Sequence, residues 1–259
     1  MTSTSIPCAV LSLLILASHS QKSNAVDLIA NGGFETGTFA GWTVASDFSS
    51  TSYDNNVTPP ASGVYVQANS LTTPVSGLST IGPATGNFYA LGDSTTAGAN
   101  VLIQNFTVPL GTTGLELSFD MFTYDWYGAG AVGSSLNFQD NPNQHVRVDL
   151  LTASSPDFDT SGPFVVVNIF DGLQTQNDVD PPAWQNYTFD LLPYVTGGAT
   201  YRLRFGAVDN QFVLNMGIDN VSVVAVPEPS TLLLGSLASL AIYVRTARGR
   251  HATVRTFLS

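Results

Sequence analysis

The residues of this chain that could do chemistry are mostly carboxylates. Between residues 27 and 226 there are eighteen aspartates and glutamates against three basic residues, so the net charge of this part is −15. A surface with this charge repels phosphate backbones, which argues against nucleic acid as a partner. Acidic loops also supply the hard oxygen ligands that calcium prefers, although solvation alone accounts for most carboxylates of a protein surface.

Residues that would support catalysis are scarce. His145 is the one histidine between residues 26 and 226, and the chain has no G-x-S-x-G, H-E-x-x-H or phosphate-binding loop motif. Its single cysteine, Cys8, lies near the N-terminus, so loss of that end would exclude thiolate catalysis and cysteine-based metal sites. We therefore expect a non-enzymatic protein. Glycoside hydrolysis by a pair of carboxylates is not excluded by the sequence, because that chemistry depends on the separation of the two groups in space.

A group of aromatic residues is a candidate for binding a ligand. Tyr124, Trp126 and Tyr127 lie together where an alternating segment gives way to a Gly-rich one, in YDWYGAGAVGSS. Sugar rings stack on aromatic side chains, so these three residues form a predicted glycan-binding platform. The alternative is a hydrophobic lid that closes the edge of the fold. Trp42 and Trp184 are instead expected in the core or at its edge.

The elements that must position these residues are short strands. Runs rich in β-branched and aromatic residues recur at intervals of about 8 to 15 residues, separated by Gly, Pro, Asn, Asp and Ser. Leu115, Leu117 and Phe119 share one face of such a run, and in a later run Arg202 and Arg204 face outwards. The pattern predicts an all-β sandwich of two antiparallel sheets rather than an α/β fold. The expected strands cover 100–108, 115–124, 145–151, 163–170, 185–191, 200–208 and 216–224.

The N-terminal end is expected to lie outside this fold. An apolar block over 6–17 is short for a membrane span, and Ser23 and Ala25 after it are the small residues of a cleavage site. This predicts a secretory signal peptide, with a signal helix, over 1–25. Its removal would take Cys8 with it.

The C-terminal end combines three features in order. A Pro-Glu-Pro sequence at 227–229 precedes an apolar run over 230–244. As a helix this run would be about 22 Å long, shorter than the roughly 30 Å hydrocarbon core of a membrane. Three arginines follow within 245–250, and basic residues after an apolar run hold it on the cytoplasmic side. The run is therefore expected to be a short hydrophobic helix and a temporary membrane stop.

This order resembles the PEP-CTERM sorting signal of Gram-negative bacteria. The resemblance covers 226–250 and leaves a basic and polar tail over 251–259. It implies export, recognition and cutting of the tail by an exosortase-type membrane processing enzyme, and transient anchoring in the inner membrane. The destination would be the cell envelope, its outer surface or the extracellular matrix. The residues implied in sorting are Pro227, Glu228, Pro229, Arg245, Arg248 and Arg250.

A second resemblance covers the middle of the chain. The opening segment LIANGGFETGTFAGWTV, the closing segment MGIDNVSVV and the run WQNYTFDLLPYVTGGATYRLRFGAV before it resemble the jelly-roll sandwich of carbohydrate-binding modules. The resemblance implies a jelly-roll domain over 26–225, with strands that end at Val224. It also implies one structural Ca²⁺, held by the carboxylates of Glu35 and Asp219 and the carbonyl of Gly33. Two carboxylates brought together repel each other unless a cation lies between them.

Two functions follow as hypotheses. The first is an exported, non-enzymatic component of the envelope or matrix, with a structural or adhesive role linked to exopolysaccharide and biofilm. The alternative is a carbohydrate-binding module whose stacking site includes Trp126 and Tyr127. A glycan-active enzyme comes third, because the chain has no nucleophile or metal-histidine motif. The expected partners are the exosortase-type enzyme and exopolysaccharide.

Overall fold

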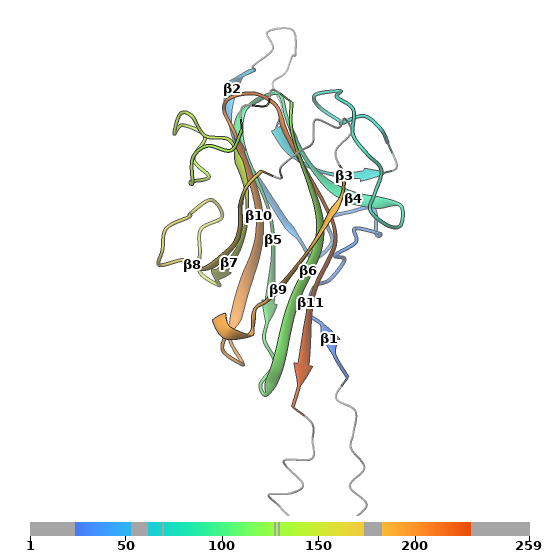
Figure 1. Cartoon of the computed structure of the whole chain (residues 1–259), viewed down its shortest axis with the longest axis vertical. Coiled ribbons are helices and arrows are strands. Elements are labelled where there is room, and N and C mark those ends of the chain that lie inside the picture. Colours follow the sequence, from blue (N-terminus) through green and yellow to red (C-terminus); the bar gives the residue numbers. More distant parts are fainter. Residues whose placement is uncertain are drawn as a thin grey trace, which may run out of the picture. The chain divides into compact units, whose positions relative to one another are not determined.

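Antiparallel strands form two sheets, as the alternating segments predict (Figure 1). The computed structural model describes residues 24–52, 62–68, 70–126, 128, 130–173 and 183–228. The expected signal helix, the C-terminal hydrophobic helix and the tail 251–259 lie outside these residues. Within the described ranges, no helix is long and apolar enough to cross a membrane.

The chain crosses between the two sheets at most of its connections. Only the pairs β3–β4 and β7–β8 are consecutive strands within one sheet, which confirms the expected jelly-roll sandwich. A short 3₁₀ turn, η1 (Leu192–Tyr194), joins β9 to β10. In spatial order, sheet A contains β3 (Ser62–Ala68), β4 (Phe88–Ser94), β11 (Leu214–Pro227), β6 (Thr112–Asp125) and β9 (Gln185–Asp190), with β1 (Val26–Asp27) also paired to β11. Sheet B contains β2 (Thr43–Ser52), β5 (Thr96–Thr107), β10 (Thr200–Asp209), β7 (His145–Thr152) and β8 (Val165–Gly172).

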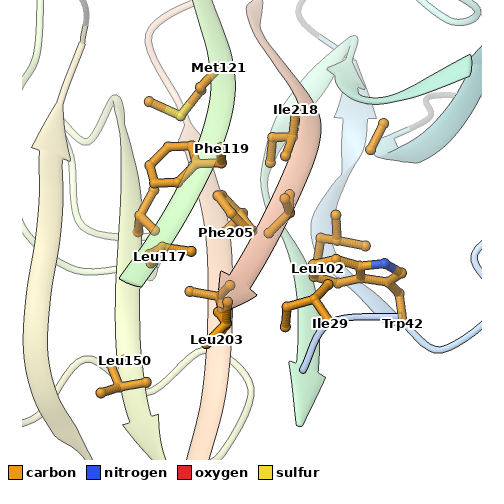
Figure 2. Close-up of a cluster of buried hydrophobic side chains, with 14 of the residues drawn as sticks. Ile29, Trp42, Leu102, Leu117, Phe119, Met121, Leu150, Leu203, Phe205 and Ile218 are labelled. Carbon is orange, nitrogen blue, oxygen red and sulfur yellow. The ribbon is translucent and has the colours of Figure 1, made fainter. Parts of the chain in front are cut away.

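The core lies between the sheets and consists of alternating residues. Leu117 and Phe119 of β6 are fully buried, as predicted, and Figure 2 shows them beside Leu203 and Phe205 of β10. The rings of Phe119 and Phe205 meet edge to face, with centroids 5.1 Å apart. Trp42 also belongs to this core, as expected, with its ring 6.3 Å from that of Phe205. Burial of each such side chain contributes about 1.5–3 kcal/mol and holds the sheets together.

A smaller cluster on the outer face of sheet A explains why β4 is missing from the predicted strands. Tyr89 and Leu91 of β4 and Phe122 of β6 are fully buried there. Trp184 packs on them, 4.7 Å from the ring of Phe122, and its Nε1 donates to the carbonyl of Gly82 at 3.0 Å. The segment between β3 and β4 therefore covers the outer side of β4. A strand that is buried on both faces has no alternation to detect.

The last strand is longer than predicted. β11 ends at Pro227 and not at Val224, because Val226 pairs with Gly114 and Pro227 pairs with Thr112 of β6. The predicted end followed a sequence motif, whereas the actual end depends on how far β6 extends beside it. The correction matters because it places the first residue of the Pro-Glu-Pro sequence within the sheet.

The expectation that Arg202 and Arg204 face solvent is wrong. Their side chains are 12% and 0% exposed. The segment between β7 and β8 covers them: Nη1 of Arg204 donates to the carbonyls of Asp157 (2.8 Å) and Asp159 (2.7 Å), and Arg202 donates to Asp157 and Ser155. Alternation identified the correct face of β10, but a loop folds over that face.

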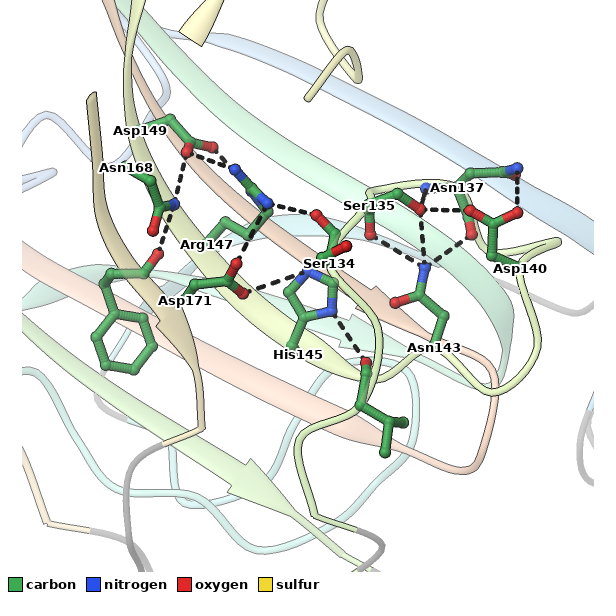
Figure 3. A network of polar contacts seen from close by, with 12 residues as sticks. Ser134, Ser135, Asn137, Asp140, Asn143, His145, Arg147, Asp149, Asn168 and Asp171 are labelled. Atoms are coloured by element: carbon green, nitrogen blue, oxygen red, sulfur yellow. Dashed lines mark hydrogen bonds and ion pairs between the residues drawn. The ribbon is translucent and has the colours of Figure 1, made fainter. Parts of the chain in front are cut away.

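Asp149 is the shared acceptor beneath this loop. It is fully buried and accepts hydrogen bonds from Arg204 Nη2 (2.7 Å), Arg147 Nη2 (2.9 Å) and Asn168 Nδ2 (2.7 Å), the last two shown in Figure 3. Burial raises the pKa of Asp149, but the hydrogen bonds from Arg147 and the charge of Arg204 outweigh it, so the pKa lies below its usual 3.8. Arg147 also contacts Asp171 at 3.3 Å. The three basic residues between 27 and 226 are thus all used to hold the fold together.

The two ends of the domain leave it side by side. Residues Asn24–Pro227 form one compact unit. Val26 of β1 pairs antiparallel with Ala225 of β11, and Figure 1 shows β1 beside the end of β11. We call this end of the sandwich the terminal pole, and the opposite end, where Leu214 pairs with Asp125, the far pole. The 14 residues of β6 separate the poles by roughly 40 Å.

Replacing Asp149 with Asn should lower the free energy of unfolding by about 3–5 kcal/mol at neutral pH, since buried guanidinium groups lose their carboxylate. The pKa of Asp149 is lower in the folded than in the unfolded chain. Its contribution to the free energy of unfolding is therefore present above about pH 4 and is lost as the pH falls through the pKa of the folded state. The difference in the free energy of unfolding between Asp149→Asn and the parent chain should therefore be smaller in acid. Urea unfolding at neutral pH and at about pH 3 measures this difference. Asp47→Asn, at an exposed position of β2, is the control. An equal gap at both pH values would contradict the assignment.

Candidate functional site

The opening segment turns sharply before β2, and its residue types explain the turn. Asn31 and Phe34 both have positive φ angles, 53° and 57°. Phe34 is nonetheless fully buried in the core, so its neighbour Glu35 points outwards. Gly32, which follows Asn31, lies so close to β11 that a Cβ would come within 1.8 Å of the carbonyl oxygen of Val221. Only glycine fits there, and the contact holds the segment against β11.

The structure places Asp219 beside Gly33, two residues before Glu35 in the opening segment. A Cβ placed on Gly33 would lie 3.8 Å from Oδ1 of Asp219 and 3.8 Å from Cγ of Glu35. The side-chain oxygen of Asn220 is at the same distance from that position. Asp219 and Asn220 lie where the register of β11 shifts against β6, and Asn220 has a φ of 52°. This β-bulge turns consecutive side chains towards one place.

The two carboxylates occupy different environments. Glu35 is exposed, and its Oε1 accepts the backbone N–H groups of Asn87 (2.8 Å) and Phe88 (3.0 Å), which lower its pKa. Asp219 is fully buried, and burial raises its pKa to about 6. The N–H groups of Thr85 (3.1 Å) and Asn220 (2.8 Å) bond to Asp219 and offset part of that effect. The raised pKa of this buried carboxylate indicates that the positive charge around it does not fully offset the cost of burying its ionised form.

Two residues of this cluster are absent from the predicted site. Asp120 of β6 lies directly opposite Asp219 and also raises its pKa. Asn220 joins the cluster by donating from Nδ2 to Asp120 Oδ2 (2.7 Å) and by accepting from the hydroxyl of Thr85 (2.6 Å). The alternation of β6 places Asp120 on the outward face, but the strand register that puts it beside Asp219 is not encoded in either strand alone.

The donor set at this point is made of oxygens. No group of three or more His, Cys, Asp and Glu side chains gathers closely enough to hold a metal ion in the part of the chain that the structure describes. A cation would therefore rely on the carboxylates of Glu35 and Asp219 together with neutral oxygens, such as a backbone carbonyl or the amide of Asn220. Calcium accepts such a mixed oxygen set, so the residues present fit it.

The predicted aromatic platform is only partly described. The rings of Tyr124 and Trp126 are in contact, with centroids 4.5 Å apart and planes at 66°, and both side chains are half-buried. Trp126 Nε1 donates to Oδ1 of Asn215 at 3.1 Å, and the amide of Asn215 donates to the buried Asp93 at 3.0 Å. Tyr127 lies outside the described residues. The pair is therefore held rigidly, and because Trp126 follows the last residue of β6, it stands at the far pole.

His145 has a structural environment. Its side chain is 1% exposed, its Nδ1 lies 3.3 Å from the carbonyl oxygen of Val132, and its Nε2 lies 3.7 Å from Asp171. Figure 3 shows His145 between these two contacts. Burial lowers its pKa, which favours the neutral ring. It belongs to the network beneath the loops of sheet B.

The sorting residues stand at the terminal pole or beyond the described part. Pro227 is the last residue of β11, and Glu228 is the last residue described. Pro229, Arg245, Arg248 and Arg250 lie outside the described residues. Residues 225–248 match the family model of the PEP-CTERM protein-sorting motif. This chain carries a PEP-CTERM motif. Such a motif implies export, sorting to the cell envelope of a Gram-negative bacterium and processing by an exosortase.

Comparison with solved structures finds domains of low sequence identity. TmCBM61, solved with β-1,4-galactotriose, is 14% identical with a TM-score of 0.43, covering 76% of this chain and 97% of that chain. The K3 cleaved adhesin domain of Lys-gingipain from Porphyromonas gingivalis is 14% identical with a TM-score of 0.43, covering 76% and 98%. The enzymatically active domain of tailspike protein 4 from bacteriophage CBA120 is 12% identical with a TM-score of 0.42; the likeness covers 77% of this chain but only 21% of that chain. Comparison with curated proteins gives no match.

Proposed function

We propose that this chain is a non-enzymatic protein of the cell envelope or extracellular matrix, delivered by exosortase processing of its PEP-CTERM tail. The observation that carries the proposal is the motif at 225–248, which begins within the last strand of a sandwich domain. The domain itself would have a structural or adhesive role, linked to exopolysaccharide and biofilm. The arrangement of the domain supports this role, because β1 and the end of β11 lie together at the terminal pole, opposite the end where Leu214 pairs with Asp125.

Changing Pro227, Glu228 and Pro229 together to Ala should leave an uncut, membrane-retained precursor. The physical reason is that the processing enzyme loses the residues that distinguish this tail from any other apolar segment. The measurement is the size and membrane fractionation of the chain in the bacterium that produces it. Pro163→Ala, in an exposed turn before β8, is the control and should be processed like the parent chain. Normal release of the triple variant would refute sorting through this motif.

A second candidate function is carbohydrate binding at the far pole. It is favoured by the Tyr124–Trp126 pair, whose rings are in contact and whose indole N–H is held by Asn215. Flat, rigid aromatic groups of this kind bind sugar rings with little loss of side-chain freedom. Asp125 is less available to a glycan, because its two carboxylate oxygens accept from Gly130 (2.9 Å) and Gln144 (3.0 Å).

Trp126→Ala should weaken retention of the purified chain on polysaccharide columns by about tenfold, since removal of an aromatic anchor costs more than 1 kcal/mol. The columns should include the exopolysaccharide of the producing bacterium. Phe48→Ala removes an exposed ring of β2 and should leave retention unchanged. Equal retention of all three proteins, or none, would remove this candidate while leaving the sorting function intact.

We also propose that one structural Ca²⁺ binds beside Gly33, Glu35 and Asp219. Support comes from the position of Asp219 beside Gly33, from the all-oxygen donor set and from the burial of Asp219. The ion would supply positive charge where a buried carboxylate now relies on backbone N–H groups. It would also join the opening segment to β11. Glu35 and Asp219, which belong to these two elements, are 184 residues apart in the sequence.

Removing calcium with EDTA should lower the melting temperature of the chain by about 5–10 °C, which is the expected effect of a ligand present at about 100 times its Kd on a domain of this size. Glu35→Ala should abolish the difference between the calcium and EDTA curves. Glu116→Ala, at an exposed position of β6, should keep it. Identical melting curves for the parent chain with calcium and with EDTA would contradict the proposed calcium site.

A further inference from the structure

The sorting motif does not begin after the folded domain but inside it. The family match starts at residue 225, and β11 continues to Pro227. Ala225, Val226 and Pro227 therefore belong both to the sorting motif and to sheet A. The domain and its processing signal share three residues, so the fold has a direct influence on which bonds a processing enzyme can reach.

Ala225 is held from both sides. It is fully buried in the core, and it pairs with Leu115 of β6 on one side and with Val26 of β1 on the other. One residue further on, the carbonyl of Val226 accepts from the hydroxyl of Thr113 at 3.1 Å. Freeing this stretch would require two strands to separate from β11 and a core residue to leave the core.

β1 fastens this stretch with one carboxylate. Oδ1 of Asp27 accepts the N–H of Val223 (3.0 Å) and the N–H of Ile29 (3.0 Å), so one oxygen joins the first strand to the last. Next to it, the N–H of Leu28 donates to the carbonyl of Val223 at 2.8 Å. β1 is only two residues long, and this side chain supplies hydrogen bonds that a longer strand would make with its backbone. We call β1 with Asp27 the N-terminal clasp.

We infer that the folded domain sets the boundary of processing: the bond broken lies C-terminal to Pro227, and the N-terminal clasp protects everything before it. The inference rests on the proposed sorting function and states where that processing acts. An enzyme that cuts a chain binds it as an extended segment free of other strands, which residues up to Val226 are not. In the reaction, the acyl carbon before the broken bond passes to water or to an acceptor amine. The downstream segment leaves with a free amino group.

The first test is the C-terminal residue of the processed protein in the bacterium that produces it, determined by intact mass and by C-terminal peptide sequencing. The expected protein ends at Pro227 or later. A protein that ends at Val226 or earlier would overturn the inference while leaving sorting itself intact. Absence of any processed protein would instead contradict the proposed function, and the inference then depends on the second test.

The second test needs no processing enzyme. The detergent-purified full chain is digested with proteinase K, and the C-terminal end of the resistant core is read by mass. The core should end at Pro227 or later, and it should do so also in Pro227→Ala, because the protection comes from the strand and not from the resistance of proline to proteases. Trimming of the folded parent chain into 214–226 would overturn the inference.

The N-terminal clasp is tested by Asp27→Ala in the same digestion. Loss of a carboxylate that joins two strands should make trimming past Pro227 about tenfold faster, because proteolysis follows the population of the locally opened state. Asp47→Ala, which removes an exposed carboxylate from β2, is the matched control and should behave like the parent chain. Equal rates for Asp27→Ala and Asp47→Ala would show that β1 does not protect the end of β11.

Discussion

The pairing of β11 with β6 is the interaction on which the rest of the structure depends. It runs from Leu214 opposite Asp125 at the far pole to Pro227 opposite Thr112 at the terminal pole. Every feature with a functional interpretation lies along it. Asn215 holds the indole of Trp126 near one end, the bulge at Asp219 lies in the middle, and the sorting motif begins at the other end. A change of register between these strands would displace all three.

The bulge shows how one irregularity serves several contacts. A regular strand would send Asp219 and Asn220 to opposite faces of sheet A. The positive φ of Asn220 breaks that alternation, so its side chain reaches Asp120 and Thr85 while Asp219 stays buried beside the opening segment. The same shift returns the following residues of β11, beginning with Val221, to the core. The candidate calcium site and the closure of the core thus have one cause.

Hydrophobic alternation predicted the inner faces of the two sheets correctly but not all of their outer faces. Alternation correctly predicted the inward residues of β6 and β10, because hydrophobic burial between the sheets acts on every second residue. Alternation also predicted, wrongly, that Arg204 faces solvent. The loop between β7 and β8 covers that face, and the carbonyls of Asp157 and Asp159 accept hydrogen bonds from Arg204. β4 escaped prediction for the same physical reason. A face that is covered by a distant segment is no longer distinguishable from the core by its residues alone.

By itself, the sequence determined the class of fold, most of its strands and the PEP-CTERM motif, because each depends on local residue order. Hydrophobic alternation and a short linear motif are properties of neighbouring residues. The tertiary structure alone decided that Asp120 joins Asp219, that Arg204 is buried, and that the sheet continues into the motif as far as Pro227. Each of these depends on the register between strands far apart in the chain and on which loop covers which face. Those arrangements follow from the packing of the whole domain, and no short segment contains them.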